Sequence, residues 1–143
     1  MILTEESYIH KINSYSKKDW EPLTKLILDI GITDKFGKLA GGEKNEDGVF
    51  TIPYWEQSLI TSKFLDAVYQ IPIIISFDWG SWDKGREMAS DSNFDFDTID
   101  IPTKCKVITA IVRSDRFCDG ALVSAFESGL ILKILKSIEK QVL

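Results

Sequence analysis

The sequence predicts a mainly α-helical fold, a single-domain bundle of about five to seven helices over residues 1–143, with room for one short β-hairpin near residues 40–52. Three observations predict it. The length of 143 residues is close to the commonest domain size and is sufficient to bury a core without metals or disulfides. Apolar residues make up 44% of the chain and charged residues 27%, which is typical of a globular protein. Apolar side chains recur mainly at spacings of three and four, the periodicity of amphipathic helices.

Two helices are expected at the N-terminus. The first covers residues 4–14, because Thr4 fits an N-cap and two glutamates follow it in the first turn. The second begins near Asp19. Pro22 is tolerated in its first turn, where the missing N–H has no helical partner. Gly31 fits the position that ends this helix.

Residues 31–50 are expected to form a loop, because glycine recurs five times and charged residues cluster there. Asp47-Gly48 is a favoured hairpin-turn dipeptide, so the loop has room for a small hairpin with a strand at residues 49–52. A helix should resume near Pro53 and stop at Pro72, since apolar residues again lie three to four apart.

The segment Ile73–Phe77 is either a strand or a buried connector, because periodicity cannot separate the two over so short an apolar run. A short helix is expected within residues 79–90. The next segment, residues 91–100, is acidic and irregular.

A third long helix follows, capped by Asp100 or Thr103, with Lys104 and Lys106 pointing outward. After a turn near residues 113–120, two further helices are predicted. They cover residues 121–127 and 130–142, and the second is apolar almost all round at its start, which indicates a central place in the core.

Charge and composition argue against several classes of function. The net charge of −5 works against non-specific binding to nucleic acid, which needs cations to replace counterions. The single histidine, His10, and two cysteines, Cys105 and Cys118, cannot supply a structural zinc site. No segment has the length and apolarity of a membrane span or a signal peptide. We therefore expect a cytoplasmic protein with reduced thiols, no membrane association and no nucleic-acid partner.

An aromatic segment, residues 77–87, is the first candidate site. Trp79 and Trp82 are three residues apart and share one face if the segment is helical. One interpretation is an aromatic core cluster in which Asp78 caps a short helix. The other is an aromatic-lined pocket with Asp78 and Arg86 as its polar groups.

The turn Arg113–Gly120 is the second candidate site. Arginine and aspartate alternate along it at Arg113, Asp115, Arg116 and Asp119. In one interpretation these residues form a salt-bridge network, and Asp119 also caps the following helix. In the other, Arg113 and Arg116 bind an anion together with backbone N–H groups of the helix that starts near Gly120.

Metal and cofactor motifs are not found in the sequence. Asp91, Asn93 and Asp95 match the first ligand positions of an EF-hand loop, but Phe96 and Pro102 stand where that loop needs Gly and Glu. Nucleotide-binding, serine-hydrolase and zinc-protease motifs are also absent from the sequence. We therefore predict no metal and no cofactor.

Three segments resemble a widespread bacterial family of unknown function. They are FDWGSWDKG at residues 77–85, RSDRFCDGAL at residues 113–122 and AFESGLILKIL at residues 125–135. The resemblance covers about residues 50–143. It implies a small, mainly helical bacterial protein, and it brings no activity and no catalytic roles. It draws attention to the following residues: Asp78, Trp79, Trp82, Arg113, Arg116 and Gly120.

Two hypotheses for function remain open. The first is a non-enzymatic binding module for a protein partner or a small anionic ligand. The second is an enzyme that acts on a phosphate-containing substrate. In that case Asp78 or Asp115 would serve as the base or as a metal ligand, and Arg86, Arg113 or Arg116 would hold the anion. Neither hypothesis specifies an oligomeric state.

Overall fold

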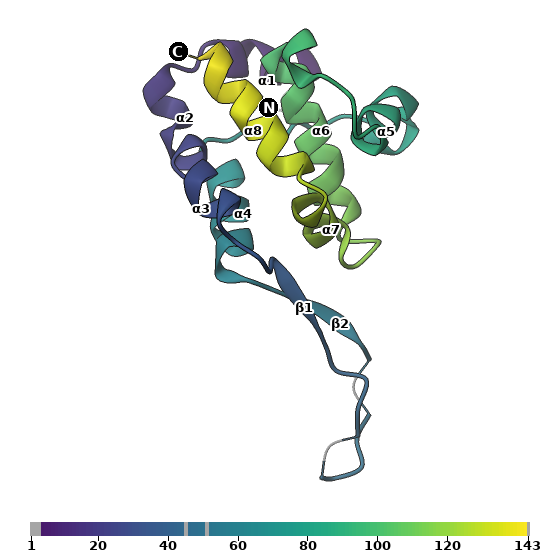
Figure 1. The fold of residues 1–143 in the computed structure, drawn as a ribbon. Helices are drawn as coiled ribbons and strands as arrows, with labels where there is room; N and C mark the ends of the chain where they lie inside the picture. The colour runs from purple at the N-terminus through teal and green to yellow at the C-terminus, as the bar shows by residue number, and fades with distance from the viewer. Residues whose placement is uncertain (1–3, 45, 51, 143) are drawn as a thin grey trace.

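The computed structural model describes residues 4–44, 46–50 and 52–142. It consists of a body of packed helices from which one β-hairpin projects (Figure 1). The predicted mainly α class with a single hairpin is therefore confirmed. None of the helices in the described residues is long and apolar enough to cross a bilayer.

The first helix agrees with its prediction and the second does not. Helix α1 (Glu5–Asn13) has Thr4 as its N-cap, and the Thr4 side chain accepts a hydrogen bond from the Ser7 N–H. The single helix expected up to Gly31 is instead two helices, α2 (Lys17–Thr24) and α3 (Ile27–Gly31). Between them the Leu26 N–H bonds to the carbonyl of Leu23, three residues back. This tighter turn breaks the helix while both leucines stay buried.

The hairpin is longer than predicted and its second strand lies later in the chain. Strand β1 (Gly37–Ala40) pairs with β2 (Tyr54–Gln57) in antiparallel register, with Gly37 opposite Gln57 and Ala40 opposite Tyr54. The strand expected at residues 49–52 is not found in the described part of that segment, and Thr51 lies outside the described residues. The prediction that a helix resumes at Pro53 is wrong.

Contacts distant in sequence explain the extended conformation of residues 54–57. The Trp55 N–H donates to the Asp119 carboxylate at 2.7 Å, and the Ser58 N–H donates to the Phe36 carbonyl at 3.0 Å. Helix α4 (Leu59–Gln70) begins only after Ser58, whose side chain accepts from the Thr61 N–H.

Residues 71–78 connect helix α4 to the short helices that follow it. Ile73, Ile74 and Ile75 are buried, but they form a connector and not a strand. The Ile75 N–H donates to the Thr109 hydroxyl, so a side chain supplies the acceptor that a neighbouring strand would give. Three short helices follow. They are η1 (Trp79–Ser81), α5 (Asp83–Ser90) and η2 (Phe96–Thr98).

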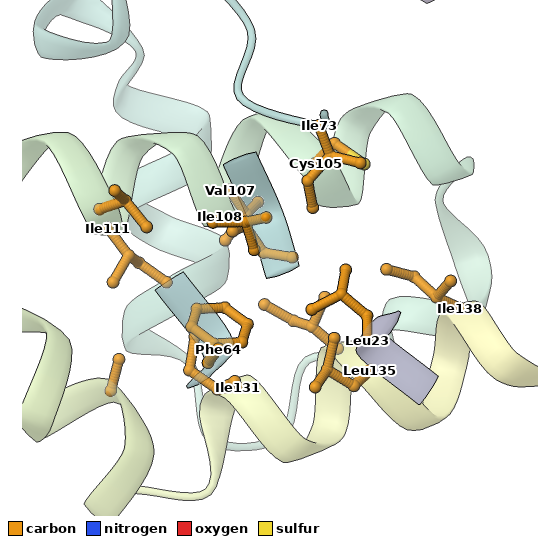
Figure 2. Packing of buried hydrophobic residues seen from close by; sticks show 14 of the residues in the cluster. Leu23, Phe64, Ile73, Cys105, Val107, Ile108, Ile111, Ile131, Leu135 and Ile138 are labelled. Atoms are coloured by element: carbon orange, nitrogen blue, oxygen red, sulfur yellow. The ribbon is translucent and has the colours of Figure 1, made fainter. Parts of the chain in front are cut away.

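The core lies between the last three helices and the N-terminal half. These helices are α6 (Ile101–Ser114), α7 (Ala121–Glu127) and α8 (Leu130–Gln141). Figure 2 shows Ile108 of α6 and Leu135 of α8 among the buried apolar side chains, with Leu23 and Phe64 beside them. Of the two caps considered for α6, Asp100 is the one observed.

Lys104 does not point outward as predicted. It is fully buried, and its Nζ donates to the Gln141 side chain at 2.6 Å, at the C-terminal end of α8. Burial lowers the Lys104 pKa, and the carboxylates of Asp97 and Asp100 partly oppose this effect. A helix C-terminus is a favourable place for a cation, which explains why a buried ammonium is tolerated here.

Candidate functional site

A small pocket lies between the aromatic segment and helix α6. Its volume is about 200 Å³. On one side it is lined by Trp79, Trp82, Arg86 and neighbouring small residues of α5. On the other side it is lined by one face of α6. That face contributes Val107, Ala110, Ile111 and Ser114. The spacing of three and four along α6 places these four side chains in one row.

Trp82 is fixed in place by its neighbours. A Cβ added to Gly85 would lie 2.1 Å from the Trp82 ring, so only glycine lets the indole rest on the α5 backbone. Phe77 packs edge-on against Trp82 with ring centroids 5.5 Å apart. The Lys106 ammonium lies 4.9 Å from the Trp82 ring centroid and 4.6 Å from that of Phe77. Such cation–π contacts contribute about 0.5–1 kcal/mol each.

Trp79 brings the aromatic segment to the arginine-bearing turn. Its ring lies 6.1 Å from that of Phe117, which belongs to the turn between α6 and α7. Phe117 is 82% exposed, the most exposed large apolar side chain among the described residues. The two segments that were selected separately from the sequence therefore meet at this pocket.

Arg86 lines the pocket but is already held by its own segment. Its guanidinium donates to the Gly80 carbonyl at 2.6 Å and pairs with the Asp83 carboxylate. Asp78 was expected to cap the short helix after it, but its side chain makes no capping hydrogen bond. Asp78 is exposed and does not line the pocket, so it is not brought together with Arg86 there.

The two aspartates of the turn hold the backbone. Asp115 accepts from the Leu122 N–H at 3.0 Å, inside the first turn of α7, and from the Gln57 amide at 3.4 Å. Asp119 accepts from the Trp55 N–H. The prediction that Asp119 caps α7 is wrong, because Gly120 is the N-cap residue and Asp115 supplies the side-chain oxygen.

Arg113 and Arg116, the two arginines of the turn, behave differently from its aspartates. Among the described residues neither guanidinium forms an ion pair or a hydrogen bond, so the salt-bridge network considered for this turn is not observed there. Arg113 follows Ala110 by three residues and therefore starts beside the pocket face of α6. Arg116 is exposed and directly precedes Phe117.

The predicted site residues thus separate into three groups. Trp79, Trp82 and Arg86 line the pocket. Arg113 and Arg116 lie at the turn beside it. Asp115 and Asp119 stabilise the turn toward the hairpin and α7. Within the described residues no three His, Cys, Asp or Glu side chains come close enough together to hold a metal ion.

Sequence reasoning missed several residues that shape the site. Phe117 was not selected, although an apolar side chain between Arg116 and Cys118 in an exposed turn is a signal for a contact surface. Gly85 was not selected either, although it lies three residues after Trp82. Lys106 was expected to point outward, and it lies over two aromatic rings and pairs with Glu5 at 2.8 Å.

Comparison with known families places the chain in a family. The model of a family of unknown function, DUF6508, matches residues 15–142. Because the match covers most of the chain, the protein belongs to this family. The match extends further toward the N-terminus than the resemblance noted over residues 50–143. No match was found among curated proteins or among solved structures.

Proposed function

We propose that this member of the DUF6508 family is a non-enzymatic interaction module. Its pocket receives one apolar side chain from a protein partner, and Arg113 and Arg116 hold an acidic group next to that side chain. The observation that carries the proposal is the small apolar pocket, whose wall residue Trp79 lies 6.1 Å from the ring of the exposed Phe117. The same turn carries two arginines that form no ion pair or hydrogen bond among the described residues.

The size of the pocket favours a protein side chain over a free metabolite. Its volume of about 200 Å³ is below the roughly 300–1,000 Å³ of pockets that enclose small molecules. A recess of this size suits a single aromatic or branched side chain. Contact sites between proteins commonly depend on a few such anchor side chains buried in pockets, with aromatic residues and arginine prominent among them.

The charge beside the pocket specifies the second part of the ligand. Arginine forms planar, two-point hydrogen bonds with carboxylates, and it binds most strongly where nothing else neutralises it. Arg86 is paired with Asp83, so Arg113 and Arg116 are the groups we assign to the anion. The ligand is therefore an apolar residue with a neighbouring aspartate or glutamate.

The enzyme hypothesis receives less support from the same geometry. It needs a carboxylate and an arginine that face one cavity. Asp115 uses both oxygens to hold Leu122 and Gln57, and Asp78 does not line the pocket. A base in either role would first have to leave its present position.

The proposal also places the module in a bacterial cytoplasm and away from nucleic acid. The two cysteines are free thiols, Cys105 buried and Cys118 exposed, which suits a reducing compartment. The net charge of −5 disfavours binding to a phosphate backbone.

A peptide titration followed by NMR tests the proposal. The probes are two blocked tetrapeptides, Gly-Phe-Asp-Gly and Gly-Phe-Asn-Gly, which differ only in the charge next to the phenyl ring. We expect the indole N–H signals of Trp79 and Trp82 to shift with the Asp peptide. Those of Trp20, which is buried elsewhere, and Trp55 should not move. The Asn peptide should bind at least about tenfold more weakly, since a charge-assisted pair contributes about 1.5–3 kcal/mol.

Two variants complete the test. Ala110→Phe fills the pocket and should abolish the shifts, while the double change Arg113→Ala and Arg116→Ala should make the two peptides equivalent. Lys136→Ala, on the exposed side of α8, is the control and should bind as the unmodified protein does. Equal binding of both peptides to the unmodified protein, or shifts that survive Ala110→Phe, would rule out the proposed site.

A further inference from the structure

Trp82 is a wall that the pocket at Trp79 shares with a second cavity. The pocket has a volume of about 200 Å³ and the second cavity about 310 Å³, and Trp82 lines both. Lys106 lines the second cavity and not the pocket. Lys106 can therefore act on the shape of the pocket only through the Trp82 ring.

The Trp82 ring is positioned without a hydrogen bond. Its indole N–H has no hydrogen-bond partner in the part of the chain that the structure describes, and the side chain is only partly buried. The ring instead rests on Gly85 and meets Phe77 edge-on, with the Lys106 ammonium nearby. Of these three neighbours Lys106 is the one that carries a charge.

Three groups hold the Lys106 ammonium at this ring. It lies 4.6 Å from the Phe77 ring centroid, 4.9 Å from that of Trp82 and 2.8 Å from the carboxylate of Glu5 in helix α1. The Lys106 side chain is only 19% exposed, and a cation–π contact is stronger where the cation has lost part of its water. Among the described residues Glu5 is the only carboxylate that pairs with Lys106.

Glu5 selects the conformation of Lys106 that reaches the two rings. A lysine side chain has many rotamers, and fixing one of them costs conformational entropy. The Glu5 carboxylate offsets this cost for the rotamer that lies over Phe77 and Trp82. Glu5 belongs to the first turn of α1, and this helix packs on the core through Ile12 and Tyr8. Packing of α1 on the body thus brings a negative charge to the place where it orients Lys106.

We propose that Lys106 is a positioning residue for the pocket, and that helix α1 supports it through Glu5. Lys106 holds Trp82 in the orientation that forms the pocket wall before a ligand arrives. Such preorganisation raises affinity, because the ring does not have to be ordered during binding. The inference rests on the proposed function of the pocket as a peptide site, and it names two residues that set the affinity of this site from a distance.

Substitutions of Lys106 test the proposal. Lys106→Met keeps the apolar stem and removes the cation, so binding of the peptide Gly-Phe-Asp-Gly should weaken about fivefold, the equivalent of one lost cation–π contact. Lys106→Arg keeps the cation and should bind as the unmodified protein does. Lys84→Met is the matched control. Lys84 lines the same second cavity and is exposed, and no ring contact of it is found among the described residues. This control should leave the affinity unchanged.

Glu5→Gln tests the contribution of helix α1. The peptide should bind about two- to threefold more weakly, because Lys106 keeps its charge but loses the carboxylate that orients it. Glu6→Gln is the matched control, since Glu6 lies in the same first turn, is exposed and forms no ion pair among the described residues. Glu6→Gln should bind as the unmodified protein does.

The mobility of the Trp82 indole, measured by ¹⁵N relaxation of its N–H in the free protein, is a readout that needs no peptide. Lys106→Met and Glu5→Gln should make this indole more mobile, whereas Lys106→Arg and the two controls should not. The indole of Trp20, which is fully buried, should keep its mobility in every variant and so report an intact fold.

Three results would each overturn the proposal. They are a Trp82 indole that stays equally rigid in Lys106→Met, a control that weakens binding as much as its partner variant, and a Lys106→Arg variant that binds as weakly as Lys106→Met. If the unmodified chain binds no peptide, the proposed function of the pocket fails. The mobility of Trp82 then still decides whether Lys106 positions the ring.

Discussion

At the scale of single residues, glycines allow two indole rings to rest directly on backbone. Gly85 lies under Trp82 and Gly120 under Trp55, with an added Cβ only 2.1 Å and 2.4 Å from the respective rings. Gly120 also has a positive φ of 93°, a conformation that other residues adopt at a cost. The pocket and the base of the hairpin each depend on one of these contacts.

The Gly85 contact gives the first prediction. Gly85→Ala should destabilise the fold by about 1–3 kcal/mol, because the methyl group forces the Trp82 ring out of a packed position. Gly31→Ala is the control, since nothing lies within 4 Å of its added Cβ at the end of α3. There we expect a gain of about 0.4–1 kcal/mol from reduced freedom of the unfolded chain. Urea denaturation measures both, and equal effects would contradict the packing argument.

Asp97 gives a prediction for acid pH. Hydrogen bonds from Ser137 at 2.5 Å and Lys140 at 3.0 Å lower the Asp97 pKa below its usual value of 3.8. The folded state therefore favours the carboxylate. Its contribution to stability is complete above the unfolded pKa and is lost as the pH falls through the lower, folded pKa.

Asp97→Asn should accordingly be less stable than the unmodified protein at neutral pH, and the difference should shrink below pH 3.8. Thermal unfolding at a series of pH values measures this difference. A stability gap that stays constant from neutral to acid pH would show that the Asp97 charge contributes nothing.

At the scale of elements, the turn between α6 and α7 connects three parts of the fold. Asp115 binds the start of α7 and the side chain of Gln57, and Asp119 binds the backbone of β2. The ring of Phe117, in the same turn, packs against the ring of Trp79. The turn therefore sets both the direction of the hairpin and the edge of the pocket.

Removal of the Asp115 carboxylate should loosen this junction. We expect Asp115→Ala to lower the free energy of unfolding by about 1 kcal/mol, the usual value of a side chain that caps a helix. Asp78→Ala is the matched control, since Asp78 is exposed and makes no capping hydrogen bond, and it should change stability by less than about 0.5 kcal/mol. Similar losses for both variants, measured in urea, would contradict the role given to Asp115.

At the scale of the whole molecule, one apolar cluster joins the helices from α1 to α8. It includes Ile12 near the N-terminus and Ile138 near the C-terminus, and its centre lies between α6 and α8 (Figure 2). Among the described residues of the hairpin, Trp55 packs against this cluster and is only partly buried. Stability should therefore be shared by the helical body as a unit, with the hairpin adding little.

A single cooperative transition is the expected result for the body. Circular dichroism and tryptophan fluorescence should give the same midpoint, because Trp20, Trp55 and Trp82 all belong to or pack against the same cluster. Two separate transitions would indicate independent domains and would contradict the prediction of one domain over residues 1–143.

Local patterns predicted most of the helices and their ends. Thr4 and Asp100 act as the predicted caps, Pro72 lies just beyond the end of α4, and Gly129 separates α7 from α8. These features depend on neighbours a few residues away, so periodicity and capping rules are sufficient. The pattern failed at Tyr54–Gln57, where partners at positions 37–40 and 119 decide the conformation.

Local sequence patterns predicted a mainly α chain and two candidate segments for function, one rich in tryptophan and one in arginine. The contacts and the burial of the residues in these segments follow from the packed structure. In the packed structure Asp115 and Asp119 bind backbone N–H groups, and Arg86 pairs with Asp83. Lys104 is buried, and Phe117 is exposed beside Trp79. The physical reason is that helix formation follows from local spacing and capping. Hydrogen-bond partners, burial and pocket shape instead arise from groups that meet only after the chain has packed.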